Sequence, residues 1–233
     1  MPFNPPSRND MGAIVLRALR DPNGSVFPPA YVDDFIAQAM ADLSAYRPKE
    51  AREISAWPAP IGIPLDPFVD FTSVWRVDFH VSGGGRFRTI TIPFADTSST
   101  ENRAGWDFYG GTLWLPAFWQ ARFTAITDGG EDGELWVWGY KDRAIPEDDA
   151  DILDLTDATD YNCVLNHCKS LGFELLTHDR ALYQQWLAAT NNSDVSPTQL
   201  SGMFNAAEGT FQRTRARNTK MRRIPSGDYV SVR

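Results

Sequence analysis

"YVDDFIAQAMADLSAYRP", residues Tyr31–Pro48, is the clearest helical stretch of the sequence. Its apolar side chains recur at positions i, i+4, i+5 and i+8, so they fall on one face of a helix. Asp33 and Asp34 lie in the first turn, where the helix dipole favours acidic side chains. Pro48 ends the helix, because the residue before a proline avoids helical backbone angles. The apolar face consists of Tyr31, Phe35, Ile36, Ala39, Met40 and Leu43.

The segment before this helix is shorter and ambiguous. "GAIVLRALRD", Gly12–Asp21, has an apolar run that fits either a short helix or a strand. "DPNG" at Asp21–Gly24 then predicts a turn, because Asp, Pro, Asn and Gly each favour turn conformations.

After Pro48 the composition of the sequence changes: Gly, aromatic and β-branched residues become frequent and no helical period is present. "VWRVDFHV", Val74–Val81, alternates between apolar and polar residues, "SGGG" turns the chain, and "RFRTITIPF" returns it as a hairpin. "WQARFTAI", Trp119–Ile126, and "ELWVWGY", Glu134–Tyr140, predict a second hairpin. The region therefore predicts a small antiparallel sandwich or barrel.

The strand at Glu134–Tyr140 is apolar on both of its faces. Trp136 and Trp138 share one face, and Leu135 and Val137 share the other. A strand of this kind is either buried on both sides or covered by another chain.

Helical patterns return after the acidic linker "IPEDDADILD", which is interpreted as a hydrated connector. An apolar stripe runs from Tyr161 to Leu176. Ser196 and Gln199 form a capping box with a proline at the first helical position, which predicts a last helix running through Phe211.

The predicted fold class is α+β: a small α-helical bundle with an inserted antiparallel β-sandwich or barrel lobe and an extended C-terminal arm. Residues 1–56 together with 142–210 form the helical core. Residues 57–141 form the inserted β domain, and residues 211–233 form a basic C-terminal arm.

Charge is divided unevenly along the chain. The formal net charge is −8, yet the residues from Ala207 onward carry +5 and the preceding 206 residues carry −13. An acidic body repels nucleic acid, so general nucleic-acid binding is disfavoured. The basic segment is either a disordered solubilising end or a docking arm whose spaced arginines grip carboxylates or phosphates.

Motifs for chemistry have simpler structural interpretations here. Cys163, His167 and Cys168 could share a metal, but no second pair of ligands accompanies them, and free cysteines are usually buried. The acidic "DGGEDGE" at Asp128–Glu134 lacks calcium-loop spacing and predicts a hairpin turn. No nucleophile elbow or histidine spacing predicts a catalytic triad. We therefore expect no catalytic residue, no cofactor and no metal site.

Targeting segments are also not recognised in the sequence. The N-terminal apolar run is too short for a signal peptide and is interrupted by Arg17 and Arg20. No stretch approaches the ~20 apolar residues that span a bilayer. The two cysteines do not call for an oxidising compartment. We expect a soluble protein of intracellular type without a membrane partner.

Three segments together resemble the head-to-tail adaptors of tailed bacteriophages, also called head-completion or connector proteins. They are "YVDDFIAQAMADLSAYRP", the strand ending in "LWVWGYKD", and the helix in "DLTDATDYNCVLNHCKSLGFELL". The resemblance implies a structural virion protein rather than an enzyme. It also implies synthesis in the host cytoplasm and a final location at the head-to-tail interface of the virion.

Such adaptors form a homo-oligomeric ring, typically twelvefold, beneath the portal protein. The resemblance implies that this ring closes the capsid, continues the channel through which packaged DNA passes without sequence-specific binding, and receives the next neck or tail protein. It also implies that the C-terminal arm grips the portal. The residues expected to dock on a portal or neighbouring chain are Phe211, Arg213, Arg215, Arg217, Lys220, Arg222, Arg223 and Tyr229.

Two other functions fit parts of the pattern. Another neck or tail-completion protein would share the assembly logic but contact tail subunits. A carbohydrate-binding β-module would line an open face with tryptophans, for which the candidates are Trp114, Trp119, Trp136 and Trp138. Their core-like alternation favours burial over an open face.

Overall fold

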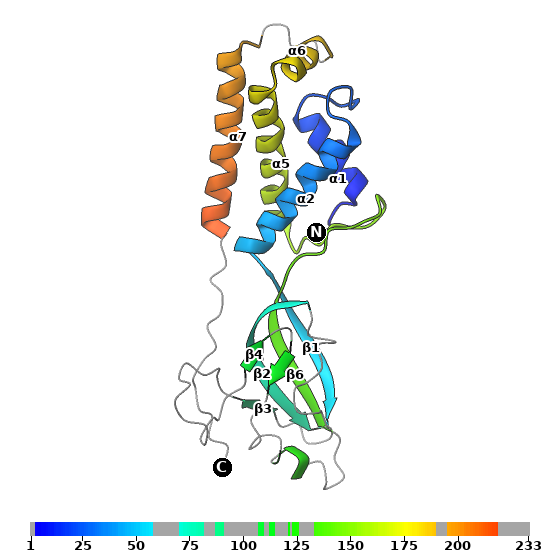
Figure 1. Ribbon diagram of the computed structural model, residues 1–233, viewed down its shortest axis with the longest axis vertical. Coiled ribbons are helices and arrows are strands. Elements are labelled where there is room, and N and C mark those ends of the chain that lie inside the picture. Colours follow the sequence, from blue (N-terminus) through cyan, green and yellow to red (C-terminus); the bar gives the residue numbers. More distant parts are fainter. Residues whose placement is uncertain are drawn as a thin grey trace. The chain divides into compact units, whose positions relative to one another are not determined.

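The computed structural model describes residues 3–57, 70–81, 87–90, 107–109, 112–114, 121, 123–125, 133–189 and 195–218 (Figure 1). These residues form both helices and antiparallel strands, which confirms the predicted α+β class. The chain divides into two compact units. The helical unit takes the chain up to Pro48 and again from Arg143, and the sheet unit takes Lys49–Asp142.

Helices α1, α5 and α7 begin at side-chain caps. Ser7 Oγ accepts a hydrogen bond from the Asp10 amide at 3.1 Å, and Asp157 Oδ1 accepts from two amides of the following turn. The predicted capping box is confirmed, because Gln199 Oε1 accepts from the Ser196 amide at 2.7 Å and Ser196 Oγ accepts from the Gln199 amide. The helices are α1 (Arg8–Ala18), α2 (Pro29–Tyr46), α5 (Ala158–His178), α6 (Arg180–Ala189) and α7 (Pro197–Asn218).

The turn between α1 and α2 is fixed by one buried carboxylate. Asp21 is 1% exposed, and its Oδ2 accepts hydrogen bonds from the amides of Val26 (2.8 Å) and Phe27 (2.9 Å). Gly24 has a positive φ of 63°, a conformation that glycine adopts without a steric penalty. The predicted turn at Asp21–Gly24 is confirmed, and the ambiguous segment before it is helical.

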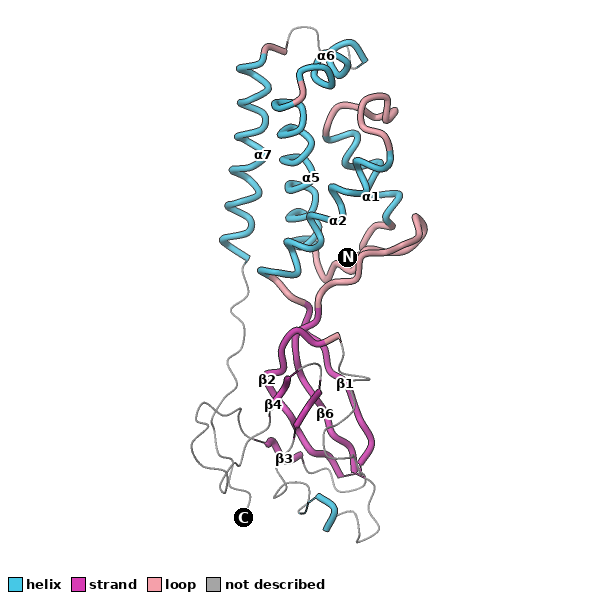
Figure 2. Tube along the Cα trace, viewed as in Figure 1, coloured by secondary structure: helices cyan, strands magenta, loops and turns pink. Residues whose placement is uncertain are grey.

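Helix α5 lies between α7 and the α1–α2 pair (Figure 2). Gly172 lets Leu19 approach, since a Cβ on this glycine would lie 2.6 Å from the Leu19 side chain. Trp186 of α6 is fully buried, and its Nε1 donates to the Leu19 carbonyl at 2.9 Å. The helical core also contains Met11, Val15, Phe27, Ile36, Met40, Leu43, Val164, Cys168, Phe173, Leu176 and Phe211.

The sheet unit contains a four-stranded antiparallel sheet in the order β1-β6-β2-β3, and β4 pairs with β5. Val77 opposes Ile90 in the β2–β3 ladder and Val137 in the β2–β6 ladder. The pairing of β2 with β3 confirms the first predicted hairpin. The strands are β1 (Lys49–Trp57), β2 (Phe71–Val81), β3 (Phe87–Ile90), β4 (Asp107–Tyr109), β5 (Thr112–Trp114) and β6 (Gly133–Lys141).

Strand β1 corrects the predicted boundary between the helical core and the inserted β domain. Residues 49–56 were expected in the helical core, but they pair with β6 from Lys49–Lys141 to Trp57–Gly133. Strand β1 lies at one edge of the described four-stranded sheet. Its charged side chains interrupt the apolar alternation of its sequence. Charged residues are typical of strands at a sheet edge, where they discourage pairing with other chains. At the other end of the insertion the helical unit resumes at Arg143 rather than at residue 142.

The second predicted hairpin is wrong. Residues 121 and 123–125 are helical, and β6 pairs with β1 and β2 instead. Phe123 is fully buried, and its ring stacks on that of Phe79 at 3.9 Å with 5° between the planes. The alanines on either side of Phe123 are strong helix formers, so their alternation with aromatic residues did not specify a strand.

In the part of the chain that the structure describes, every helix is too short or too polar to span a lipid bilayer.

Candidate protein-docking surface

The basic segment begins on a helix rather than on a free arm. Helix α7 continues to Asn218, so Arg213, Arg215 and Arg217 lie in its last turns, where cations are favoured by the helix dipole. Arg213 and Arg217 are exposed. The Arg215 guanidinium lies over the Tyr46 ring of α2, 5.2 Å from its centre. Lys220, Arg222, Arg223 and Tyr229 of the expected docking set lie outside the described residues.

Phe211 was expected to anchor the arm on another chain, and the structure corrects this. Its side chain is only 2% exposed and belongs to the helical core. The ring stacks on that of His167 in α5, with centroids 4.1 Å apart and 12° between the planes. The periodic apolar stripe of α7 was a sufficient signal for this burial. Phe211 therefore fastens α7 to its own chain.

His167 is a buried polar residue of the helical unit, 7% exposed. Its Nδ1 lies 3.4 Å from Asp42 Oδ2. Burial lowers the pKa of His167 below its ordinary value, although the nearby carboxylates Asp42 and Glu208 act in the opposite direction. Burial also raises the pKa of both Cys163 and Cys168 thiols. No group of three potential metal ligands occurs among the residues that the structure describes.

Glu208 adds a polar fastening between α7 and α5. Burial alone would raise the pKa of Glu208, but hydrogen bonds from Ser170 Oγ (2.5 Å) and Gln212 Nε2 (2.6 Å) lower it on balance. The carboxylate is therefore ionised in the folded helix and holds both donors. Together with Phe211 it fixes the rotation of α7 about its axis.

The neutral, buried His167 makes the stability of the helical unit dependent on pH. The unfolded chain binds a proton near pH 6.5, whereas the folded chain binds it only at lower pH. As pH falls from 6.5 towards 5, the free energy of unfolding should therefore decrease, by at most about 1.4 kcal/mol per pH unit. Urea unfolding followed by helical circular dichroism measures this slope. His167→Gln should remove its contribution, whereas His178→Gln, at an exposed position of α5, should retain it; an unchanged slope in His167→Gln would contradict the assignment.

A buried ion network at the N-terminus of α5 was missed by sequence reasoning. Asp160 is fully buried and lies 3.0 Å from both Arg47 Nε and Arg143 Nη2. Arg47 Nη2 also contacts Asp157 Oδ2 at 2.6 Å, and Arg143 Nε donates to the Arg47 carbonyl. Burial would raise the pKa of Asp157, but the amide of Asp160 and the charge of Arg47 lower it. Arg47 lies two residues before β1 and Arg143 two residues after β6, so the network holds together the two places where the helical unit is interrupted.

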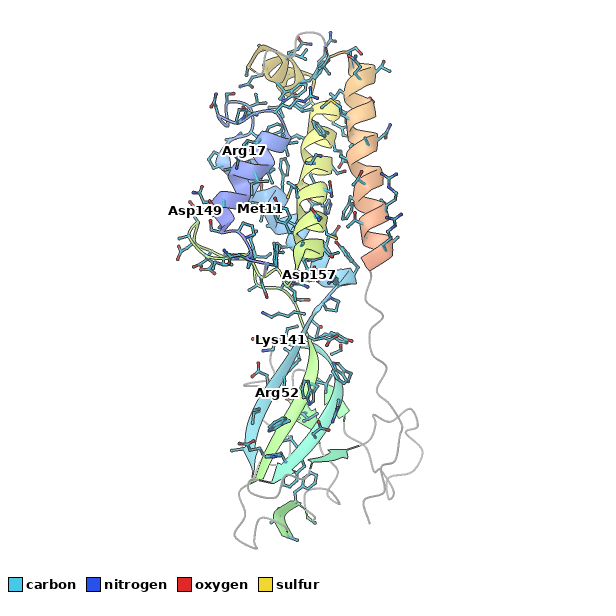
Figure 3. All side chains as sticks on the ribbon, turned by 180° about the vertical axis from the view of Figure 1, so that it is seen from behind. Met11, Arg17, Arg52, Lys141, Asp149 and Asp157 are labelled. Atoms are coloured by element: carbon cyan, nitrogen blue, oxygen red, sulfur yellow. The ribbon has the colours of Figure 1, made fainter. Side chains whose placement is uncertain are left out.

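The sheet unit carries a second distinctive surface, the tryptophan face of β6. Leu135 and Val137 are fully buried on one side, and Trp136 and Trp138 are half-buried on the other. The Arg52 guanidinium lies 4.3 Å from the Trp136 ring centre and 5.4 Å from that of Trp138. Figure 3 labels Arg52 on the sheet. This face is thus only half-buried, and the Arg52 guanidinium packs on it through cation–π contacts from the same chain.

Hydrogen bonds to carboxylates also hold the indole rings of the same two tryptophans in place. Trp138 Nε1 donates to Asp78 Oδ2 at 3.1 Å, and Trp136 Nε1 donates to Glu134 Oε2 at 2.9 Å. The side chains of Trp114 and Trp119, the other two tryptophans considered for a sugar platform, lie outside the described residues. Stacking of a sugar on Trp136 would have to displace Arg52.

Comparison with protein-family models gave no match, and comparison with the curated proteins gave none either.

Proposed function

We propose that this protein is a head-to-tail adaptor of a tailed bacteriophage. Copies of the chain form a ring, with twelve as the expected number, beneath the portal protein of the virion. The ring extends the channel for packaged DNA and joins the capsid to the next neck or tail protein. The proposal includes the finer architecture of a helical adaptor bundle with an inserted β-sandwich or barrel lobe and a C-terminal arm, and it assigns the protein no catalytic role.

The observation that carries this proposal is that the basic segment starts on a helix packed into the bundle. A solubilising tail would leave the helical bundle before its charges begin. Here the first three arginines lie on α7, which is fastened to α5 by Phe211 and Glu208 and to α2 by Arg215. These first three positive charges therefore lie at fixed positions on each copy, as a clasp on a neighbouring protein requires.

The acidic remainder of the chain supports the same function. With −13 before Ala207, the body repels the DNA that would pass through a ring, so the DNA can slide without being held. An adaptor also needs two attachment sites, and the helical and sheet units supply separate surfaces. The carbohydrate-binding alternative is disfavoured, because the Arg52 guanidinium already packs against the rings of Trp136 and Trp138.

Co-sedimentation with the portal protein of the same virus tests the arm directly. The full chain should bind the portal ring at a fixed stoichiometry. A chain ending at Asn218 keeps the whole of α7 but lacks Lys220, Arg222 and Arg223, and it should lose this binding. In the full chain, Arg222→Gln with Arg223→Gln should weaken it by about tenfold. Arg17→Gln with Arg180→Gln removes two exposed charges from α1 and α6 and should leave binding unchanged.

Equal binding by the chain ending at Asn218 would reject the portal-docking arm. Binding of the full chain to a tail protein but not to the portal would assign it to a different position in the neck.

A further inference from the structure

The outward face of α7 carries a continuous stripe of small and basic residues. The α7 stripe consists of Gly202, Ala206, Gly209, Arg213 and Arg217, which recur every three or four residues and so lie on one side of the helix. This side is opposite to the buried positions Leu200, Ala207 and Phe211, as the helical repeat requires.

Packing within the same chain does not explain the two glycines of the α7 stripe. Glycine weakens a helix interior relative to alanine, so a buried contact usually accounts for it. Gly172 of α5 has such a contact with Leu19, but a Cβ on Gly202 would meet nothing within 4 Å. A Cβ on Gly209 would meet only Arg213 Nη1, at 3.9 Å. Small residues at this spacing allow the backbone of another chain to come close, and the arginines beside them favour an acidic one.

An acidic surface of the same helical unit fits this description. The acidic loop, residues 145–152, was expected to be a hydrated linker, but it is held against the start of α1. The Arg8 amide donates to the Asp151 carbonyl and the Asn9 amide to the Asp149 carbonyl, at 2.9 and 3.0 Å. The Arg8 guanidinium also donates to the carbonyls of Pro146 and Glu147. The loop is therefore a fixed platform.

The outward side of the acidic loop combines charge with exposed apolar groups. Asp148, Asp149 and Asp151 are exposed. Ile145 is 44% exposed and Ile152 is 61% exposed, and both are among the few large apolar side chains that the described residues leave in solvent. Apolar side chains surrounded by charges are the usual composition of a protein interface.

The α7 stripe and the acidic loop lie on opposite sides of the helical unit. Figures 1 and 3 show α7 on one side and the loop, marked by Asp149, on the other, near the end at which α7 finishes. One copy cannot bring these surfaces together, but two copies placed side by side can. A contact between two different surfaces of identical chains repeats from copy to copy, and it produces a ring when the rotation closes.

We infer that the α7 stripe of one copy binds the acidic loop of the next copy. The glycines leave room for Ile145 and Ile152, at the two ends of the loop, and Arg213 and Arg217 pair with the aspartates between them. This inference rests on the proposed function, because it names the contact between neighbours of the proposed ring. It assigns self-association to α7 up to Asn218 and leaves portal docking to the residues that follow.

Sedimentation equilibrium of the purified full chain over a dilution series tests the inference. At low ionic strength the wild type should self-associate, and association should weaken as salt screens the charges. Arg213→Glu with Arg217→Glu should weaken it by about tenfold or more, and so should Asp148→Lys with Asp149→Lys. An equimolar mixture of these two double variants should associate again. The acidic α7 stripe of the first variant can then bind the basic loop of the second, and the basic stripe of the second can bind the acidic loop of the first.

A variant with no charge change separates contact from electrostatics. Gly202→Leu adds a side chain in open space, so it should fold normally by circular dichroism yet associate about tenfold more weakly or worse. Ser201→Leu, one residue away at an exposed position that faces another direction, is the matched control and should associate like the wild type.

A wild-type chain that stays monomeric at low ionic strength would overturn the inference. So would self-association that neither double variant weakens, or a mixture that does not recover it. These outcomes do not decide the proposed adaptor function, which the portal co-sedimentation experiment tests separately. The two failures can be told apart, because the chain ending at Asn218 keeps both surfaces of the self-contact but lacks the proposed portal-docking residues.

Discussion

Asp160→Asn should lower the free energy of unfolding of the helical unit by about 3–5 kcal/mol, the usual cost of removing one partner from a buried ion pair. The substitution preserves the shape of the side chain, so it isolates the charge. It leaves the guanidinium of Arg143, whose side chain is 1% exposed, and that of Arg47, at 10%, without their shared carboxylate. It also alters the acceptor of the Thr156 amide, which lies 2.8 Å from Asp160 Oδ2.

Urea unfolding followed by circular dichroism at a helical wavelength measures this effect in the unit concerned. Asp148→Asn is the matched control, because its exposed side chain should change stability by no more than about 0.5 kcal/mol. A loss below about 1 kcal/mol in Asp160→Asn would mean that the two arginines find other partners or water.

The second large effect is expected at the aromatic fastening of α7. Phe211→Ala should cost about 3–5 kcal/mol, because it removes a buried ring and leaves a cavity beside His167. The last turns of α7, with Arg213 and Arg217, should then separate from α5. Amide hydrogen exchange in residues 208–218 should therefore accelerate more than in α2.

Phe211→Leu serves as the graded control, since it fills much of the same volume and should cost less than Phe211→Ala. Arg217→Ala should leave exchange in α5 unchanged, because Arg217 is exposed. If Phe211→Ala leaves both stability and exchange unaltered, the arginines of α7 are not held in place by the core.

Local patterns predicted the elements whose signals are complete within a few residues. The apolar spacing from Phe35 to Leu43 specified α2, the box at Ser196 and Gln199 specified the start of α7, and the alternation of Val74–Val81 specified β2. Each pattern carries its own physical cause: one-sided burial, satisfied end amides or pleated alternation.

The missed features depend on partners distant in sequence. The charged residues of β1 obscure the alternation that would predict a strand, and this edge strand forms by pairing with β6, which lies far along the sequence. Asp160 reads as an ordinary acidic residue in the first turn of a helix, and only the folded chain brings Arg47 and Arg143 to it. Phe211 was assigned to the arm because of the arginines that follow it, although the period of α7 already placed it in the core.

The candidate docking surface divides in the same way. The positive charge of the C-terminal segment is evident from the sequence, and the spacing of Arg213 and Arg217 predicts that both lie on one helical face. The acidic loop could not be identified as a platform, because its order comes from backbone hydrogen bonds to α1 rather than from its own residues. The open space around Gly202 also becomes visible only when α7 is packed.

The mass and symmetry of the particle formed with the portal protein of the same virus test the central claim most directly. Electron cryo-microscopy of that complex should reveal a closed ring of this chain, coaxial with the portal, in which α7 of each copy contacts the loop around Asp149 of its neighbour. A single copy bound to the portal, or no bound chain at all, would contradict the account.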